Sequence, residues 1–313
     1  MGGGALRVTG TFLDEISHDI PSQNWGPAEW DRDFATMKKM GLDTVILIRC
    51  GHKRWLTYPS DVLMGSEGGW RPPIDLVDLF LTMAEKHGLT FWFGTYDSGQ
   101  YWHAGQGDKE LEINLKVVDE VWKRYGKRRA FGGWYLSLEI GRQHLPVVDI
   151  YAKLGRHCKE LSGGLPTLIS PYIEGTKRIY IPEDQRLTPE QHAKEWDQIL
   201  AAVRGAVDVV AFQDGECSFD ELPEFLEVNR RLADKHGLKS WTNAESFDRD
   251  MPIRFLPIKW EKMLLKLDAA GRAGFEKAIT FEFSHFMSPN SCYAQARGLC
   301  DRYREHFGIP DPR

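Results

Sequence analysis

The chain has 313 residues, of which 42% are hydrophobic and 27% are charged, and its formal net charge is -5. These values are typical of a globular protein, and without a dense basic run they argue against a nucleic-acid partner. The sequence also has no apolar stretch near the roughly 20 residues that a membrane span needs.

In chain order, the apolar pattern predicts strands and helices in strict alternation. The strands are expected at 7–15, 43–50, 89–97, 131–139, 166–172, 207–214, 239–245 and 278–284. The helices are expected at 27–40, 74–87, 109–125, 147–161, 189–204, 220–236, 256–273 and 293–306. Several helices end in a glycine that leads straight into an apolar run, as in FATMKKMGLDTVILI and RRLADKHGLKSWT. This pattern fits a left-handed helix cap followed by a buried strand.

Strict alternation favours parallel strands with helical crossovers, and eight such units in a chain of this length match a (β/α)8 TIM barrel of the α/β class. No linker divides the sequence, so residues 1–313 are expected to form a single barrel domain. The strand-to-helix loops are long, and the loops at 51–73 and 172–188 are expected to roof an active cleft. A doubly wound sheet is the alternative, although no GxGxxG follows the first strand.

Acidic and polar side chains stand at most of the predicted strand ends. In a barrel, the carboxyl ends of the strands carry the functional site. An acid there can also cap the next helix or pair with a loop arginine. In strand order the side chains are Asp14 and Glu15, Arg49, Tyr96 and Asp97, Glu139, Ser170 and Tyr172, then Gln213, Asp214 and Glu216, Asn243 and Glu245, and Glu282, Ser284 and His285.

Two of these acids, Glu139 and Glu245, are the candidate catalytic residues. Strand alternation places each on the same face as the residues two and four positions before it, so both would point into one pocket if those faces point inward. A pair of carboxylates flanking a bond is what glycoside hydrolysis needs. Arg49 could hold the attacking carboxylate ionised, or it could form a structural ion pair.

Other barrel chemistries lack their residues. No predicted strand ends in lysine, as a Schiff-base enzyme would need, and no HxH follows the first strand. The five cysteines show no CxxC spacing, so neither a zinc knuckle nor a disulfide framework is expected. No metal and no cofactor are therefore expected.

Aromatic side chains are frequent in the loops that follow the predicted strands. Their flat faces suit stacking under a sugar ring, although long loops also pack themselves down with aromatics. The residues predicted to bind substrate are Arg49, Tyr96, Asp97, Tyr172, Gln213, Asn243, Glu282, Trp241, Trp55 and Trp102.

Two segments, GTFLDEISHDIPSQNWGPAEWDRDFATMKKMGLDTVILIRCG and FGGWYLSLEIG, carry a resemblance to a known family. The chain resembles an uncharacterised bacterial family, often of Bacteroides type, of glycoside-hydrolase-like (β/α)8 barrels. Its layout is also similar to the large clan of retaining barrel glycosidases. That similarity implies an acid/base at Glu139, a nucleophile at Glu245 and a supporting arginine at Arg49. The chain departs from the clan at Leu138, where asparagine is usual, and at the end of the eighth strand, where it has Ser284 and His285 in place of the usual tryptophan.

The sequence therefore predicts a retaining glycoside hydrolase with a carbohydrate substrate. The alternative is a barrel that binds a carbohydrate without cleaving it, because fold does not fix function. The first residues, MGGG, do not form a signal peptide, so an exported protein whose signal has been removed and a cytoplasmic protein both stay open.

Overall fold

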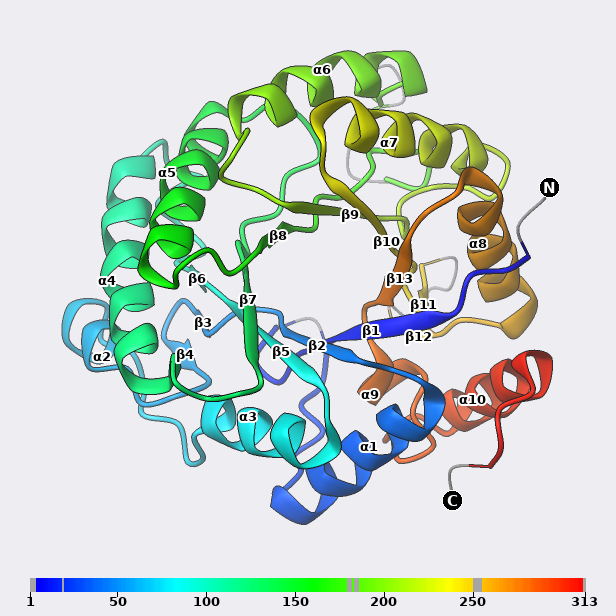
Figure 1. Ribbon diagram of the computed structural model, residues 1–313, viewed down its shortest axis with the longest axis horizontal. Helices are drawn as coiled ribbons and strands as arrows, with labels where there is room; N and C mark the ends of the chain where they lie inside the picture. The colour runs from blue at the N-terminus through cyan, green and yellow to red at the C-terminus, as the bar shows by residue number, and fades with distance from the viewer. Residues whose placement is uncertain (1–3, 19, 179–181, 183–185, 250–254, 312–313) are drawn as a thin grey trace.

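The computed structural model describes residues 4–18, 20–178, 182, 186–249 and 255–311. Parallel strands close into a barrel in the order β1, β13, β10, β9, β8, β7, β5 and β2, seen end-on in Figure 1. The barrel strands are β1 (Val8–Leu13), β2 (Thr44–Leu47), β5 (Thr90–Gly94), β7 (Phe131–Tyr135), β8 (Thr167–Ile169), β9 (Val209–Gln213), β10 (Lys239–Asn243) and β13 (Lys277–Thr280). The predicted fold class, an α/β TIM barrel, is confirmed.

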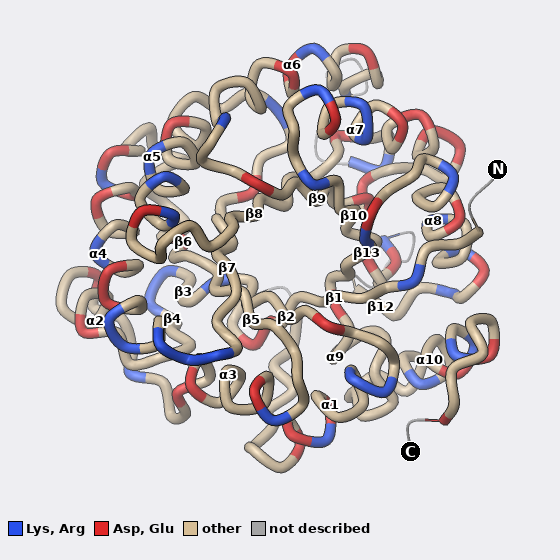
Figure 2. Tube along the Cα trace, viewed as in Figure 1, with Lys and Arg blue, Asp and Glu red and all other residues tan. Residues whose placement is uncertain are grey.

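A ring of helices surrounds the barrel, one after each barrel strand (Figure 1). These helices are α1 (Pro27–Met40), α3 (Leu76–His87), α4 (Gly107–Tyr125), α5 (Leu145–Leu161), α6 (Pro189–Ala202), α7 (Leu222–His236), α8 (Trp260–Ala273) and α10 (Ala294–Phe307). Each buries one apolar stripe against the strands and leaves a polar face outside, which is the amphipathic pattern of the sequence. Figure 2 shows Lys, Arg, Asp and Glu spread in both signs along this outer ring.

The helix-to-strand connections are short because a glycine ends the helix and turns the chain, as the sequence indicated. Gly41 caps α1 with φ 91°, and Gly237 caps α7 with φ 68°. This left-handed conformation is open to glycine at no steric cost, and it turns the chain back toward the barrel. The long connections therefore gather at the opposite end of the barrel, where the strands finish.

Apolar side chains, among them Phe12 and Leu168, fill the barrel interior. Toward the start of the strands, the rings of Trp92 and Trp241 lie 5.5 Å apart, and the ammonium of Lys277 lies 5.0 Å from the Trp241 ring. Lys277 is the first residue of β13, so this cluster marks the amino-terminal end of the barrel. Because the interior is packed at this end, a ligand site is expected at the carboxyl-terminal end of the barrel.

The strand-to-helix loops contain short strands and helices that the sequence did not predict. A three-stranded sheet joins β3 (Gly51–His52), β4 (Trp55–Leu56) and β6 (Tyr96–Asp97), and β11 (Phe247–Asp248) pairs with β12 (Leu256–Pro257). Two short helices, α2 (Asp61–Ser66) and α9 (Phe283–Phe286), complete the set. Among the described residues, none of the helices combines the length and the apolar character needed to cross a membrane.

Candidate active site

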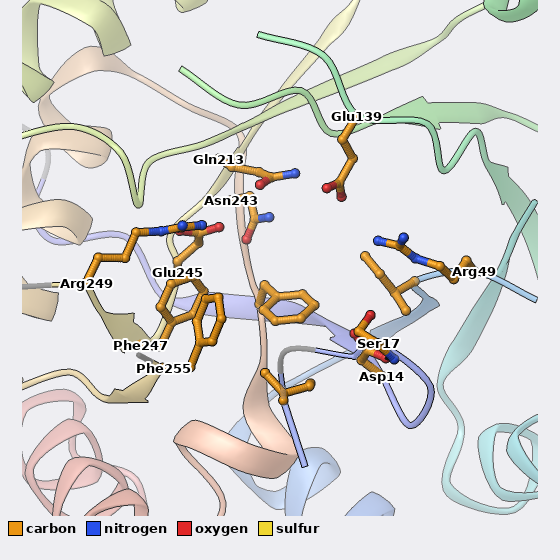
Figure 3. A pocket seen from close by; sticks show the side chains of 13 residues that line it. Asp14, Ser17, Arg49, Glu139, Gln213, Asn243, Glu245, Phe247, Arg249 and Phe255 are labelled. Atoms are coloured by element: carbon orange, nitrogen blue, oxygen red, sulfur yellow. The ribbon is translucent and has the colours of Figure 1, made fainter. Parts of the chain in front are cut away.

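A cavity lies beyond the carboxyl-terminal ends of the barrel strands. Its wall comes from the end of β13 and from the loops after β1, β2, β7 and β10, together with the last residue of β9. Arg49, Glu139, Gln213, Asn243 and Glu245, all predicted site residues, meet there (Figure 3). The full lining is Asp14, Ser17, Ile20, Ile48, Arg49, Glu139, Gln213, Asn243, Glu245, Phe247, Arg249, Phe255 and Phe281.

Both glutamates stand in loops rather than in strands. β7 ends at Tyr135 and β10 ends at Asn243, so the predicted strands 131–139 and 239–245 were too long. The ladder stops after β7 because the N–H of Ser137 donates to the hydroxyl of Thr95, at 3.0 Å, and not to a strand carbonyl. The two carboxylates nevertheless line the same cavity.

Glu139 is half-buried and lies beside Arg49 in the cavity (Figure 3). The hydroxyl of Tyr135 donates a 2.9 Å hydrogen bond to Glu139 Oε1. Burial raises the pKa of Glu139, whereas the positive charge of Arg49 and the hydrogen bond from Tyr135 oppose that rise. The ionised form of Glu139 therefore has two stabilising partners.

Asp97 holds Arg49 in place. Arg49 Nη1 donates to Asp97 Oδ2 at 2.9 Å, and the indole N–H of Trp102 and the backbone N–H of Gly99 donate to Asp97 Oδ1 at 3.0 Å and 2.8 Å. Burial opposes ionisation of Asp97, but the His52 ring, with Nδ1 3.4 Å from Oδ2, and the charge of Arg49 outweigh it and hold the pKa of Asp97 well below its usual range. Asp97 is therefore a permanent anion that orients the cation beside Glu139.

Glu245 is more deeply buried than Glu139. It is 3% exposed, and its Oε2 has no hydrogen-bond partner in the protein. Arg249 Nε lies 4.0 Å from Oε2. Burial raises the pKa of Glu245 to about 7, although the charges of Arg249 and Lys266 oppose the rise. A carboxyl group with this pKa can carry a proton at neutral pH.

The backbone of Glu245 rests on a buried ion pair. Lys266 Nζ lies 2.7 Å from Asp214 Oδ1, and both side chains are buried. The same Asp214 oxygen accepts the N–H of Glu245 at 3.0 Å, and Lys266 donates to the carbonyl of Glu245 at 3.0 Å. A charged pair that binds both peptide groups of one residue fixes where its side chain begins.

Four buried polar atoms of the lining residues have no partner in the protein: Asp14 Oδ2, Asn243 Oδ1, Glu245 Oε2 and Arg49 Nε. Buried polar atoms in proteins are nearly always hydrogen-bonded, so four exceptions around one cavity mark it as a polar ligand site. Within the described ranges, no group of three or more His, Cys, Asp and Glu side chains could hold a metal ion. The wall offers hydrogen-bond acceptors and the guanidinium groups of Arg49 and Arg249 to a polar ligand.

Sequence reasoning missed or underrated several residues of the wall. Phe281 closes the cavity at the end of β13, and Phe247 and Phe255 pack edge to face with ring centroids 4.7 Å apart. Arg249 lies over both of these rings, at 5.1 Å and 5.4 Å. Asp14 Oδ1 accepts the N–H groups of two loop residues, whereas its Oδ2 has no hydrogen-bond partner in the protein. The sequence alone does not tell that one carboxylate oxygen of Asp14 binds the loop while the other is left for a ligand.

Several residues predicted to bind substrate lie outside this wall: Tyr96, Asp97, Trp102, Tyr172, Trp241, Glu282 and Trp55. Tyr96 donates its hydroxyl to the carbonyl of Lys53 at 2.8 Å, and Glu282 accepts backbone N–H groups at the start of α9. Tyr172 receives a hydrogen bond from Arg178 at 3.1 Å, and Trp241 fills the barrel interior. Direct contact of these residues with a substrate stays a prediction.

The loop at 51–73 does not roof the cavity as predicted, since none of the described lining residues belongs to it. β3 pairs with β4 within this loop and with β6 in the loop after β5, so the loop packs against the loop after β5. Parts of the other predicted roof, at 179–181 and 183–185, lie outside the described residues. The loops after β1 and β10 contribute to the wall instead.

The sequence and fold are similar to those of known proteins. The profile of a family described as Domain of unknown function (DUF4434) matches residues 8–293. The crystal structure of a candidate alpha-L-fucosidase from Bacteroides thetaiotaomicron is 56% identical in sequence, with 98% of this chain and 95% of that chain covered and a TM-score of 0.95. A search of curated proteins finds no match to this chain.

More distant solved structures share the barrel. Cellulose synthase subunit Z from Clostridioides difficile is 15% identical, with 95% of this chain and 99% of that chain covered and a TM-score of 0.59. The endo-1,4-beta-mannanase from Rhizomucor miehei is 13% identical, with 90% and 89% covered and a TM-score of 0.56. At these identities the likeness shows the fold alone.

Proposed function

This chain belongs to the family described as Domain of unknown function (DUF4434), and we propose that it is a retaining glycoside hydrolase whose catalytic residues are Glu139 and Glu245. The observation that carries the proposal is that both carboxylates line one cavity at the carboxyl-terminal end of the barrel. Hydrolysis of a glycosidic bond needs one carboxyl group that protonates the leaving oxygen and a second that attacks the anomeric carbon or activates water.

The surroundings of the two carboxylates favour different roles for them. The pKa of Glu245 is raised to about 7 by burial, and its Oε2 has no hydrogen-bond partner in the protein, so this group can supply a proton at neutral pH. Burial raises the pKa of Glu139 as well, but Arg49 and the hydroxyl of Tyr135 oppose that rise and stabilise the ionised form. We therefore assign the acid/base to Glu245 and the nucleophile to Glu139. This division is the reverse of the one that the similarity to the retaining clan implies, because Arg49 lies beside Glu139.

The rest of the wall suits a sugar. Gln213 and Asn243 lie between the two glutamates in Figure 3 and present amide groups to the cavity. Asp14 Oδ2 and Asn243 Oδ1 can accept hydrogen bonds from ring hydroxyls, since each lacks a partner in the protein. Phe281 adds an apolar face. The relative at 56% identity, a candidate alpha-L-fucosidase, makes fucosides the first substrates to test.

The test compares hydrolysis and binding in matched variants. Glu139→Gln and Glu245→Gln should each lower turnover of aryl glycosides at least about 10²-fold, because neither glutamine can donate a proton or form the glycosyl ester. Calorimetric binding of the corresponding sugars should persist. Glu112→Gln, at an exposed acid on α4, is the control and should keep full activity. If the unmutated protein binds sugars but cleaves nothing in a broad panel that begins with aryl α-L-fucosides, the protein is a binding barrel and not a hydrolase.

Azide separates the two roles. With an activated aryl glycoside, azide should rescue Glu139→Ala and give a glycosyl azide of inverted configuration, because the anion replaces the missing nucleophile. In Glu245→Ala, azide should attack the glycosyl-enzyme and give a product of retained configuration. NMR of the anomeric proton reads both results. The opposite pattern would return the acid/base role to Glu139.

A further inference from the structure

A second groove lies next to the cavity, between the loop after β1 and the loop after β2. Glu15, Ser22 and Trp25 line it from the first loop, and Trp55, Trp70 and Arg71 line it from the second. Trp55 therefore lines this groove and not the cavity that holds Glu139.

The groove presents two indole rings to solvent. Trp55 is 58% exposed and Trp70 is 45% exposed, whereas most large apolar side chains of the described chain are buried. Their ring centroids lie 4.6 Å apart at an interplanar angle of 82°. Two exposed tryptophans whose rings contact each other in one groove form a contiguous apolar surface, and such surfaces commonly mark binding sites.

The rings are held in place before any ligand arrives. Trp55 lies in β4, which pairs with β3. The N–H of Trp70 donates to the carbonyl of Arg54 at 2.8 Å, and the Arg54 guanidinium lies 4.8 Å from the Trp70 ring. Arg54 Nε in turn donates to the carbonyl of Gly68 at 2.7 Å. A binding surface fixed in this way loses little conformational entropy when a ligand docks.

Polar groups border the apolar rings. Glu15 accepts the hydroxyl of Ser22 at 2.5 Å and the N–H of Gln23 at 3.2 Å, and Asn24 and Arg71 also line the groove. Flat indole faces next to hydrogen-bonding groups match a sugar ring, which has an apolar face and a rim of hydroxyls.

The groove and the cavity share one wall. Asp14 and Ser17 line the cavity, while Glu15 and Ile16 line the groove. The turn that carries these residues is fixed by Asp14 Oδ1, which accepts the N–H groups of Ile16 and Ser17 at 3.1 Å and 3.0 Å. A ligand longer than one sugar unit can therefore touch both sites.

We propose that this groove is a second carbohydrate subsite, in which Trp55 and Trp70 together form the apolar contact surface for a sugar unit next to the one held in the cavity. The substrate is then an oligosaccharide and not a simple monoglycoside. The role of the groove in cleavage rests on the proposed function, but its binding of sugar does not.

The experiment measures affinity for sugars of increasing length. Calorimetry with monosaccharides and with fucosyl-, manno-, xylo- and gluco-oligosaccharides of two to four units is done on the Glu139→Gln protein, so that no ligand is consumed. Trp55→Ala and Trp70→Ala should each lower the ratio of oligosaccharide to monosaccharide affinity about fivefold to tenfold. Trp55→Phe should keep most of the ratio because it keeps an aromatic face. Leu265→Ala, at an exposed apolar residue of α8, is the control and should not change it.

The outcomes separate this inference from the proposed function. If both alanine variants keep the full ratio, or if Leu265→Ala lowers it equally, the subsite does not exist. Failure of every oligosaccharide to bind more tightly than its monosaccharide also overturns it. Tryptophan-dependent binding without hydrolysis of any glycoside would support the groove and reject the hydrolase. If the unmutated protein hydrolyses aryl glycosides but the tryptophan variants keep the ratio of oligosaccharide to monosaccharide affinity, the hydrolase is supported and the groove is rejected.

Discussion

Arg49 and Asp97 form a hydrogen-bonded ion pair, with Arg49 Nη1 2.9 Å from Asp97 Oδ2, beside the carboxylate of Glu139. The pair links the loop after β2 to β6, which lies beyond the next barrel strand. The backbone N–H of Gly99 and the indole N–H of Trp102 also donate to Asp97, and His52 Nδ1 lies 3.4 Å from its Oδ2. The position of the cation at Glu139 therefore depends on a residue that does not line the cavity.

Asp97→Asn should lower kcat more than it raises KM, because Arg49 would no longer be held in the orientation that favours ionised Glu139. An amide cannot replace the charge, so we expect a loss of about tenfold or more in kcat, and about 1–3 kcal/mol in the free energy of unfolding. Asp61→Asn is the control, since Asp61 pairs with Arg124 at the surface and is 83% exposed. Steady-state kinetics and urea unfolding give the two readouts. Equal kcat in both variants would mean that the ion pair only supports the fold.

Glu245 should make the protein less stable as pH rises. Its pKa is raised from 4.5 to about 7, so between these values the folded state holds a proton that the unfolded state has lost. The stabilisation is complete below pH 4.5 and is lost as pH rises through about 7, up to about 3 kcal/mol in all. Glu245→Gln removes this dependence. The stability of the variant relative to the unmutated protein should therefore increase between pH 5 and pH 8 in urea titrations, and a constant difference would contradict the raised pKa.

Arg249 should set the alkaline limb of the pH–activity profile. Its positive charge lowers the pKa of Glu245, against the larger effect of burial that raises it. If Glu245 is the acid, Arg249→Gln should move the pH at which kcat/KM falls to a higher value, because the proton is then held more firmly. Arg272→Gln, at an exposed pair with Asp268 on α8, is the matched control. An alkaline limb that stays in place would assign that ionisation to another group.

The barrel could be predicted from sequence because its signals are periodic and local. The glycines after α1 and α7 and the apolar runs that follow them depend on neighbouring residues alone. Glu139 and Glu245 could be selected because strand alternation put each on the same face as the inward-pointing residues before it. Their roles could not, because the pKa of each depends on side chains far away in the chain, such as Arg49 beside Glu139.

The walls of the site were harder to predict than its centre. Trp55 looked like part of the roof because its loop is long, but the pairing of β3 with β6 draws that loop away from the cavity. Phe281 gave no signal beyond its place at the end of an apolar run, although it lines the cavity. Contacts between loops from different strands decide both positions, and a single sequence does not record them.

Gly215→Ala should displace Glu245 and so impair hydrolysis. A Cβ added at Gly215 would lie 1.5 Å from Glu245 Oε2, which is far inside van der Waals contact, so the carboxyl group would have to move. We expect kcat to fall at least about 10²-fold, since a displacement near 1 Å can cost that much. Gly298→Ala is the control, because nothing lies within 4 Å of its added Cβ. There alanine in α10 should stabilise the protein by about 0.5–1 kcal/mol without loss of activity. If Gly215→Ala folds normally and keeps its full kcat, the position of the Glu245 carboxylate does not matter for catalysis, and Glu245 cannot be the proton donor.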